Sequence, residues 1–440
     1  MSEYLALWML PVLIGLIFLG LPVAFAMMGT TLVFGYLVFG DALVFQLVEK
    51  VEDVAGNFVL AAVPLFVFMG AMLERSGIAE RLFEAVHIWT RRLPGGLALG
   101  TIVMCVIFAA STGVIGATET IVGMLAIPVM LRYGYNKAMI CGTIAAGGSL
   151  GTIIPPSVVV VILGPLANVS VGDLLAGMVF PGLILAGTYM VYILARCLID
   201  PTAGPVIAAD DDDPPLLEKL WITARALVPP FAMIFAVLGS LFSGIAAPTE
   251  AAALGAFGSV VLAAGYGRLS LAALHDALMR CLSITAMIML ILLAGNMLTG
   301  VFVGAGGVTL TQDLLEALKL GPTGVLLLVL ALGFAAGFVI DWVSICLILV
   351  PIFAPVLRAA GVDMAWFCIL FLIIIQTSYL TPPMAPAIFY LRGIAPPEIT
   401  MRHMYWGMIP FLACQFVVLG LVFAFPQLVL WLPEQILGFN

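Results

Sequence analysis

Two polar segments interrupt long apolar stretches at matching places in the two halves of this chain. The first runs from Gly148 to Ser157 and contains Pro155-Pro156; the second runs from Thr377 to Met384 and contains Pro382-Pro383. Proline lacks the amide hydrogen and disfavours helix in the residue before it, so each pair should stop a helix inside an apolar span. A stopped helix exposes unpaired carbonyl groups at one end and unpaired N–H groups at the other. Carbonyls with Ser and Thr hydroxyls suit a hard monovalent cation such as Na⁺, and the N–H ends suit an anionic group.

A segment rich in small residues precedes each break. Residues 110–120 lie inside the apolar stretch 96–131, and residues 333–341 lie inside the apolar stretch 321–357. Each stretch either crosses the membrane twice or dips in and returns. The helix on each side of the first tip has only about 15 residues, which is short for a full crossing. We therefore expect re-entrant hairpins with tips at mid-depth, where non-helical backbone survives only if it is buried or lines a wet cavity.

The tips and the breaks together predict two cation sites, one in each half, and a weaker set of substrate-binding residues. The first predicted cation site combines Ser111, Thr112, Gly113 and Gly116 with Gly148, Ser149, Gly151 and Thr152. The second combines Gly337 and Asp341 with Thr377, Ser378 and Thr381. The substrate-binding candidates are Thr118, Pro155, Pro156, Ser157, Pro382 and Pro383.

Three carboxylates in apolar surroundings are functional candidates: Glu119, Glu250 and Asp341. Aligning Pro128 with Pro351 places Thr118 opposite Asp341. Asp341 either contributes to a cation site or caps the N-terminus of a half-helix, and both roles are compatible. Glu250 follows Pro248-Thr249, which predicts the start of a helix, because acids favour the first turn.

The composition is that of an all-α polytopic membrane protein. Hydrophobic residues make up 64% of the 440 residues and charged residues 9%, where a soluble domain has roughly 25% charged residues. The mean hydropathy is +1.24. Apolar stretches of about 20 residues predict five spans and one hairpin in each half. The predicted spans are 4–21, 23–40, 55–74, 137–167, 173–197, 220–241, 246–266, 281–303, 363–391 and 405–431.

An odd number of spans in the first half makes the second half enter from the opposite face, which predicts an inverted repeat. We predict a first repeat at 1–199, an acidic, Pro-rich linker at 200–219 and a second repeat at 220–440. Spans 4–74 and 220–303 would form a scaffold, and 137–167 and 363–391 would be the broken spans. This topology puts 13 of the 16 Lys and Arg residues on one side, as expected of the cytoplasmic face. The linker is then cytoplasmic and the C-terminus periplasmic.

Other features narrow the class of protein. His87, His275 and His403 are expected in loops, which excludes proteases and haem proteins that need a histidine within a span. No Gly-x-x-x-x-Gly-Lys-Ser/Thr motif is present, so the chain is not expected to hydrolyse ATP, and no enzymatic activity is expected. Amphipathic segments at 41–54, 78–92 and 308–319 predict interfacial helices, either ordinary loop helices or arms that brace a scaffold against a moving part.

Three motifs together resemble the large membrane (M) subunit of tripartite ATP-independent periplasmic (TRAP) transporters, the DctM-like family of the ion transporter superfamily. They are 151–157 (Gly-Thr-Ile-Ile-Pro-Pro-Ser), 243–253 (Ser-Gly-Ile-Ala-Ala-Pro-Thr-Glu-Ala-Ala-Ala) and Thr381-Pro382-Pro383, and the resemblance covers essentially the whole chain. It implies Na⁺-driven uptake of organic acids across the bacterial inner membrane by an elevator-like movement. It also implies Na⁺ sites at the hairpin tips and unwound segments. The first tip departs from the Ser-Gly-Ser-rich version of many members.

The resemblance also implies two separate protein partners, a small four-span membrane subunit and a periplasmic solute-binding protein. The other expected partners are an organic acid substrate and the lipid bilayer; no nucleic acid is expected. A stand-alone Na⁺/carboxylate symporter or exchanger of related architecture is the main rival hypothesis. A channel or a purely structural membrane subunit is the alternative outside the transporter class.

Overall fold

The computed structural model describes residues 2–113, 116–207, 215–317, 319–338, 340, 342–382 and 385–438, and these residues form helices and connections without a strand. The first half contains α1 (Ser2–Phe18), α2 (Val23–Phe39), η1 (Gly40–Ala42), α3 (Leu43–Ala55), η2 (Phe58–Ala61), α4 (Ala62–Arg75), α5 (Ile78–Thr90), α6 (Gly96–Thr112), α7 (Ala117–Arg132), α8 (Lys137–Ser149), η3 (Leu150–Thr152), α9 (Val158–Ala167), α10 (Val171–Gly177) and α11 (Val179–Ile199). The second half contains α12 (Leu216–Phe242), α13 (Pro248–Gly265), α14 (Leu271–Gly304), α15 (Gly307–Ala317), α16 (Pro322–Ala336), α17 (Trp342–Ala359), α18 (Met364–Leu380), α19 (Pro386–Ile394), α20 (Met401–Ala424) and α21 (Gln427–Leu437).

Many of these helices are long and apolar enough to cross a membrane. In the described part of the chain, eight helical segments meet that standard: Val23–Ala55, Phe58–Arg75, Val171–Ile199, Leu216–Phe242, Pro248–Gly265, Leu271–Gly304, Trp342–Ala359 and Met401–Ala424. Large apolar side chains such as Phe25, Phe235 and Leu282 are exposed on the outer helices. In water such a surface would be costly, whereas in lipid it is the expected boundary. The chain is therefore a multi-pass, all-α membrane protein.

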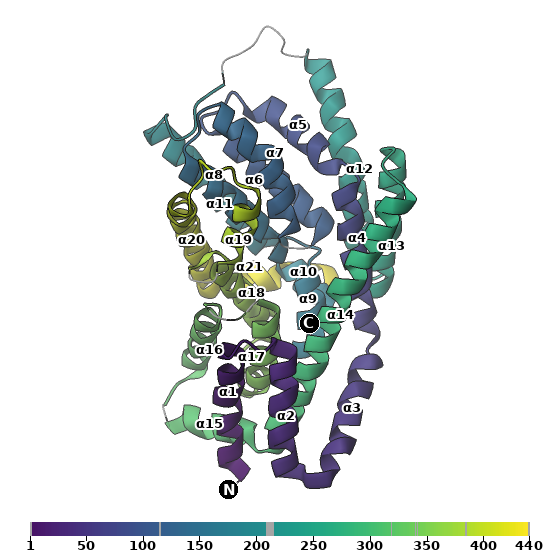
Figure 1. Ribbon diagram of the computed structural model, residues 1–440, viewed down its shortest axis with the longest axis vertical. Helices are drawn as coiled ribbons and strands as arrows, with labels where there is room; N and C mark the ends of the chain where they lie inside the picture. Colours follow the sequence, from purple (N-terminus) through teal and green to yellow (C-terminus); the bar gives the residue numbers. More distant parts are fainter. Residues whose placement is uncertain are drawn as a thin grey trace.

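The two halves use the same order of elements around their breaks. In the first half α6 and α7 form a hairpin, and α8 follows and is separated from α9 by the Pro155-Pro156 segment. In the second half α16 and α17 precede α18, which is separated from α19 by residues 381–385. Figure 1 shows α6 and α7 in the upper part of the molecule and α16 and α17 in the lower part. The opposite orientation of the two halves stays a prediction, which this placement supports.

Both broken helices begin with a side-chain cap. The Asn136 side chain accepts hydrogen bonds from the amides of Ala138 (2.9 Å) and Met139 (3.3 Å) at the start of α8. The Asp363 side chain accepts a bond of 2.8 Å from the amide of Trp366 at the start of α18. Each cap satisfies an amide that has no partner within its helix. Caps of the same kind thus fix the starting points of the two helices that end at the breaks.

Removing the first cap is expected to loosen α8. We expect Asn136→Ala to lower the free energy of unfolding by about 0.5–2 kcal/mol, the usual effect of losing such a cap. The measurement is the melting temperature of the purified protein in detergent. Lys137→Ala, one residue along, removes no cap and is the control. Equal melting temperatures for Asn136→Ala and the unsubstituted protein would contradict the role assigned to the cap.

Two predicted spans differ from the observed helices. The span predicted at 405–431 is two helices, because α20 ends at Ala424 and α21 begins at Gln427. Pro426 explains the break, since Phe425 before it adopts a non-helical backbone (φ −126°, ψ 78°). Conversely, the span predicted at 281–303 belongs to α14, which already begins at Leu271, so residues expected in a loop are helical. The helix start predicted at Glu250 is observed: its side chain accepts a bond of 2.8 Å from the Ala247 amide.

The first residues of the predicted linker are not a simple tether. Their backbone pairs with the base of the first hairpin: the Gly95 amide donates to the Gly204 carbonyl (3.0 Å), and the Ile207 amide donates to the Arg91 carbonyl (3.1 Å). Ala203 is buried, and its carbonyl accepts from the Asn136 amide (3.1 Å). Residues 203–207 therefore dock on the hairpin, and α12 begins at Leu216 inside the segment predicted as linker.

Helix α18 is almost completely buried. Every residue from Phe367 to Leu380 is buried, and α18 packs against α8, α16, α17 and α20. A helix that is apolar all round fits this position, because it presents no face to water. Its end, where the second break begins, is therefore held at the centre of the molecule.

Candidate functional site

The first hairpin tip lies directly on the first break. Gly113 and Gly116 take left-handed backbone angles at the tip (φ 62° and 82°), which glycine adopts without strain. A Cβ atom on Gly113 would lie 2.7 Å from the carbonyl oxygen of Pro156, and the Gly113 carbonyl accepts a long bond of 3.5 Å from the Val158 amide. The first tip and the first break are thus in backbone contact, as the predicted first site requires.

The second tip approaches the second break in the same way. A Cβ atom on Gly337, at the end of α16, would lie 2.0 Å from the Cβ atom of Ser378 on α18. Gly337 and Ser378 are therefore brought together as predicted. Asp341 and Pro383 lie outside the described residues.

Contacts between the halves join the two sites. The Tyr379 hydroxyl on α18 donates a hydrogen bond of 2.8 Å to the Glu119 carboxylate at the start of α7. The Gln376 amide on α18 donates a bond of 3.0 Å to the Ser149 hydroxyl at the end of α8. All four side chains are buried. Glu119 also packs on Gly148, where a Cβ atom would lie 1.9 Å from the Cγ atom of Glu119. The four tip and break segments therefore converge on one buried region.

The predicted residues lie at the helix ends where exposed acceptors are expected. Ser111 and Thr112 end α6, Thr118 is in the first turn of α7, Gly148 and Ser149 end α8, and Gly151 and Thr152 form η3. Pro155, Pro156 and Ser157 make up the first break, Thr377 and Ser378 are in the last turn of α18, and Thr381 and Pro382 follow it. Gly116 faces the Tyr390 ring of α19 in the other half, whereas Gly113 faces the first break.

The hydroxyl groups at these helix ends donate hydrogen bonds to backbone carbonyls of the preceding turn. Each donates to a carbonyl three or four residues earlier, at 2.6–3.0 Å: Ser111, Thr112, Ser149, Thr152, Thr377, Ser378 and Thr381. A hydroxyl has one hydrogen and two lone pairs. Once the hydrogen is used in this way, the lone pairs remain as acceptors. The oxygen atoms available at the two predicted sites are therefore those of hydroxyl and carbonyl groups, which suit a hard cation.

Three further buried oxygens near the breaks lack a hydrogen-bond partner among the described residues. They are the Glu119 Oε1, Gln376 Oε1 and Ser157 Oγ atoms. Leaving such groups unsatisfied costs about 1–3 kcal/mol each, and more for a charged group. An arrangement with several buried acceptors and few donors favours a positively charged ligand.

A cavity of about 570 Å³ opens beside this region. Gly113, Gly116, Tyr379 and Tyr390 line it from the tip and break segments. The opposite wall belongs to α4 and α14 and carries an ion pair, in which Arg280 Nη1 lies 2.9 Å from Glu74 Oε2. The Glu74 side chain is nearly buried, whereas the Arg280 side chain is 40% exposed. The Arg280 guanidinium group thus lies across the cavity from the tip and break segments.

Three side chains at this site were not predicted from the sequence. Gln376, Tyr379 and Tyr390 were not among the predicted residues, although they form the contacts and the cavity wall described above. Gln376 could have been identified from the sequence, because it is the first polar residue in the apolar run of α18. The two tyrosines could not, because their partners come from the other half of the chain.

Known proteins resemble this chain in sequence and in fold. The family model described as "Tripartite ATP-independent periplasmic transporter, DctM component" matches residues 10–428. The sialic acid TRAP transporter large permease protein SiaM of Vibrio cholerae is 29% identical over 428 residues, covering 97% of this chain and 98% of that protein. The C4-dicarboxylate TRAP transporter large permease protein DctM of Pseudomonas aeruginosa is 30% identical over 403 residues, covering 90% and 91%.

A longer relative and a solved structure extend the comparison. The isethionate TRAP transporter permease protein DctMQ of Oleidesulfovibrio alaskensis is 30% identical over 348 residues, which cover 78% of this chain and 53% of that protein's length. The crystal structure of the Alcanivorax borkumensis YdaH transporter has the same fold, with a TM-score of 0.68 and 17% sequence identity, covering 97% of this chain and 99% of that one. The family model spans nearly the whole chain. This protein therefore belongs to the DctM family of tripartite ATP-independent periplasmic transporters, as a large permease subunit and not an enzyme.

Proposed function

We propose that this permease subunit imports small organic acids together with Na⁺, with the acid delivered by a separate binding protein. The observation that carries the proposal is the convergence of both tips and both breaks on one buried region beside a cavity. Broken helices in corresponding positions of two halves are a typical site of substrate and ion binding in secondary transporters.

The oxygen atoms at the tips and breaks support Na⁺ as the transported coupling ion. Seven hydroxyl groups keep lone pairs available, and carbonyl groups at the ends of α6 and α8 lie beside them. Hydroxyl and carbonyl oxygens are hard ligands, and a broken helix supplies them without burying a full negative charge. We propose one ion at the first tip and first break and one at the second.

The cavity beside the tips supports a small acid as the substrate. Its volume of about 570 Å³ lies within the range of small-molecule sites, about 300–1,000 Å³. Arg280 lines it, and a guanidinium group has five N–H donors, so one bond to Glu74 leaves others for a carboxylate. The relatives named for sialic acid, C4-dicarboxylate and isethionate transport are named for acids of different size. Isethionate carries a sulfonate and the other two carry carboxylates, so the group common to these substrates is an anionic oxygen group. We propose that this chain recognises a carboxylate.

The walls of the cavity support an elevator movement. One wall consists of α4 and α14, which pack with α2, α3 and α13, and the other consists of the tip and break segments. We propose that the first group is a scaffold fixed in the membrane. The hairpins and broken helices would then move past it as one body and carry the site from one face to the other.

The family supports the proposed assembly and location. A tripartite transporter has three components, and we propose that this chain works with a small four-span membrane subunit and a periplasmic solute-binding protein. The proposed location is the bacterial inner membrane, with the linker in the cytoplasm and the C-terminus in the periplasm. The excess of Lys and Arg on the linker side supports this orientation.

Uptake by proteoliposomes tests the proposal. Vesicles contain this chain and its small membrane subunit, and labelled four-carbon dicarboxylates, keto acids and sugar acids are supplied with an inward Na⁺ gradient. We expect uptake of one class that requires both Na⁺ and the cognate binding protein. Equal uptake without Na⁺ would contradict the cation sites. Uptake without the binding protein would instead favour a stand-alone symporter.

A further inference from the structure

A second cavity lies at the other end of α14. It has a volume of about 330 Å³ and is lined by the end of α3 and the segment after it, the end of α9, the second half of α17 and the far part of α14. Between Arg280 in the first cavity and Asn296 in this one, α14 rises about 24 Å at 1.5 Å per residue. The two cavities share no lining residue, and their linings come within one helical turn of each other at Ile288 and Leu292 of α14. In the proposed orientation this outer cavity faces the periplasm.

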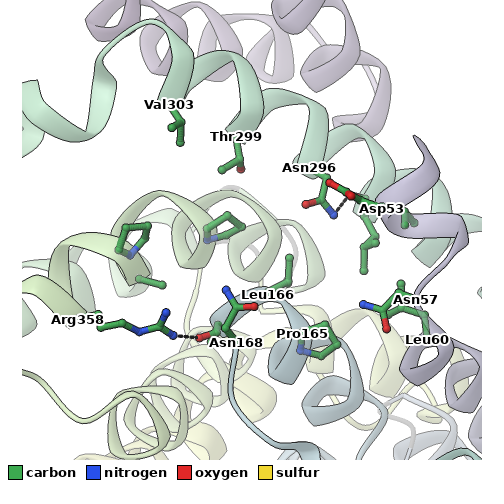
Figure 2. A pocket seen from close by; sticks show the side chains of 16 residues that line it. Asp53, Asn57, Leu60, Pro165, Leu166, Asn168, Asn296, Thr299, Val303 and Arg358 are labelled. Carbon is green, nitrogen blue, oxygen red and sulfur yellow. Dashed lines mark hydrogen bonds between the residues drawn. The ribbon is translucent and has the colours of Figure 1, made fainter. Parts of the chain in front are cut away.

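The outer cavity is polar on both sides. Figure 2 shows Arg358 and Asn168 on one side, with Asn296 and Thr299 of α14 facing them across the space. Asn57 and Asp53 lie at one end. The walls come from both proposed groups of helices: α9 and α17 belong with the tips and breaks, and α14 belongs to the proposed scaffold.

The charge in the outer cavity is unbalanced. Arg358 donates one hydrogen bond of 2.7 Å, from Nη2 to the Ala167 carbonyl at the end of α9. Within the described ranges no carboxylate lies within ion-pair distance of Arg358. Asp53, the acid on the rim, is instead paired with Lys50 at 2.8 Å. The guanidinium group therefore keeps several N–H donors and its full charge for a ligand.

The neighbouring amides add donors that are free or weakly used. The Asn168 side chain forms no hydrogen bond within the described part of the chain, and its backbone is left-handed at the end of α9 (φ 50°). Among the described residues, the Asn296 amide makes one hydrogen bond, a long one of 3.4 Å to the carbonyl of Leu292 on its own helix. An arginine flanked by two amides is a set of donors that matches a carboxylate, which arginine binds with two parallel bonds.

We propose that the outer cavity is an anion subsite that binds the carboxylate of an arriving acid before the acid reaches the tips. Arg358 supplies the charge, and Asn168 and Asn296 orient the group. The proposal rests on the proposed import of organic acids, and its site is distinct from the cavity beside the tips. Because the walls come from both groups of helices, the subsite exists only while α9 and α17 lie against this part of α14.

Charged thiol reagents test the subsite without any transport. Thr299→Cys places a thiol in the cavity of the full-length chain, in right-side-out membrane vesicles. The rates of modification by a negatively charged and a positively charged membrane-impermeant methanethiosulfonate are compared. Both rates depend equally on the fraction of the thiol that is ionised. The ratio of the anionic to the cationic rate therefore reports the local electrostatic potential. We expect the anionic reagent to be favoured, and Arg358→Gln to lower the ratio at least about fivefold. Lys319→Gln, another outer cation away from the cavity lining, is the matched control.

Protection by carboxylates tests binding itself. We expect succinate or benzoate to slow the modification of Thr299→Cys, and we expect Arg358→Gln and Asn296→Leu each to remove this protection. Asn296→Leu leaves the hydrogen bond from Arg358 to Ala167 intact. If Arg358 only stabilised the fold through that bond, Asn296→Leu would not remove the protection. Protection by neither acid, or protection that survives either substitution, overturns the proposal. A failure of Na⁺-driven uptake would not affect these measurements, so the two proposals fail separately.

Discussion

Replacing Gly148 with alanine is expected to reduce both the stability and the uptake of this permease. The added Cβ atom would lie 1.9 Å from the Cγ atom of Glu119, which is held by its bond to Tyr379. Crowding of this kind costs about 1–3 kcal/mol. Since α8 and α7 meet here beside the first predicted cation site, we expect uptake to fall at least about tenfold, the factor that 1.4 kcal/mol represents. The measurements are the melting temperature and the initial rate of uptake under a Na⁺ gradient.

A second substitution separates crowding from general damage. Combining Gly148→Ala with Glu119→Ala removes the side chain that the new methyl group would meet, so the melting temperature should recover while uptake stays low. Gly187→Ala is the matched control, because a Cβ atom on Gly187 of α11 meets nothing within 4 Å. A double variant as unstable as Gly148→Ala would show that Glu119 is not the obstacle.

Replacing Tyr379 with phenylalanine is expected to have the second-largest effect. It removes one hydroxyl and leaves Glu119 without a hydrogen bond from the described residues. Leaving a buried acceptor without its hydrogen bond costs about 1–3 kcal/mol, so we expect uptake to fall about tenfold or more. Initial uptake rates at several Na⁺ concentrations are the measurement.

The pair can be tested as a unit by a double-mutant cycle. If Tyr379 acts through Glu119, then Glu119→Gln in the Tyr379→Phe background should add less than the product of the two single effects. Tyr36→Phe is the control, because Tyr36 is exposed on α2, far along the chain from either break. Strictly multiplicative losses would mean that the two residues act independently.

The helices around the breaks were predictable because their signals are local. Pro155-Pro156 and Pro382-Pro383 mark the breaks, and the spans predicted at 137–167 and 363–391 begin within one residue of α8 and α18. The end of α20 was missed although Pro426 marks it, because the apolar stretch continues past the proline. The docking of residues 203–207 was also missed, since backbone hydrogen bonds to Arg91 and Gly95 leave no mark on residue types.

The candidate site was predictable within each half but not between the halves. Gly113 and Gly337 suggested tips that approach a break, and both contacts are observed. Glu119 was singled out as an intramembrane acid, yet its partner Tyr379 lies 260 residues away. Hydropathy and motif spacing report on neighbours along the chain, whereas this bond depends on how the two halves pack. The same holds for Ser149 and Gln376.

The length of α14 has a consequence for the surrounding lipid. With 34 residues it is about 51 Å long, whereas the hydrocarbon core of a bilayer is about 30 Å thick. A helix longer than the hydrocarbon core must tilt, kink, thicken the bilayer locally or extend into the water on either side. Because α14 lines both the inner and the outer cavity, a change in its tilt would alter both openings together. We therefore expect bilayer thickness to influence both cavities through the tilt of α14.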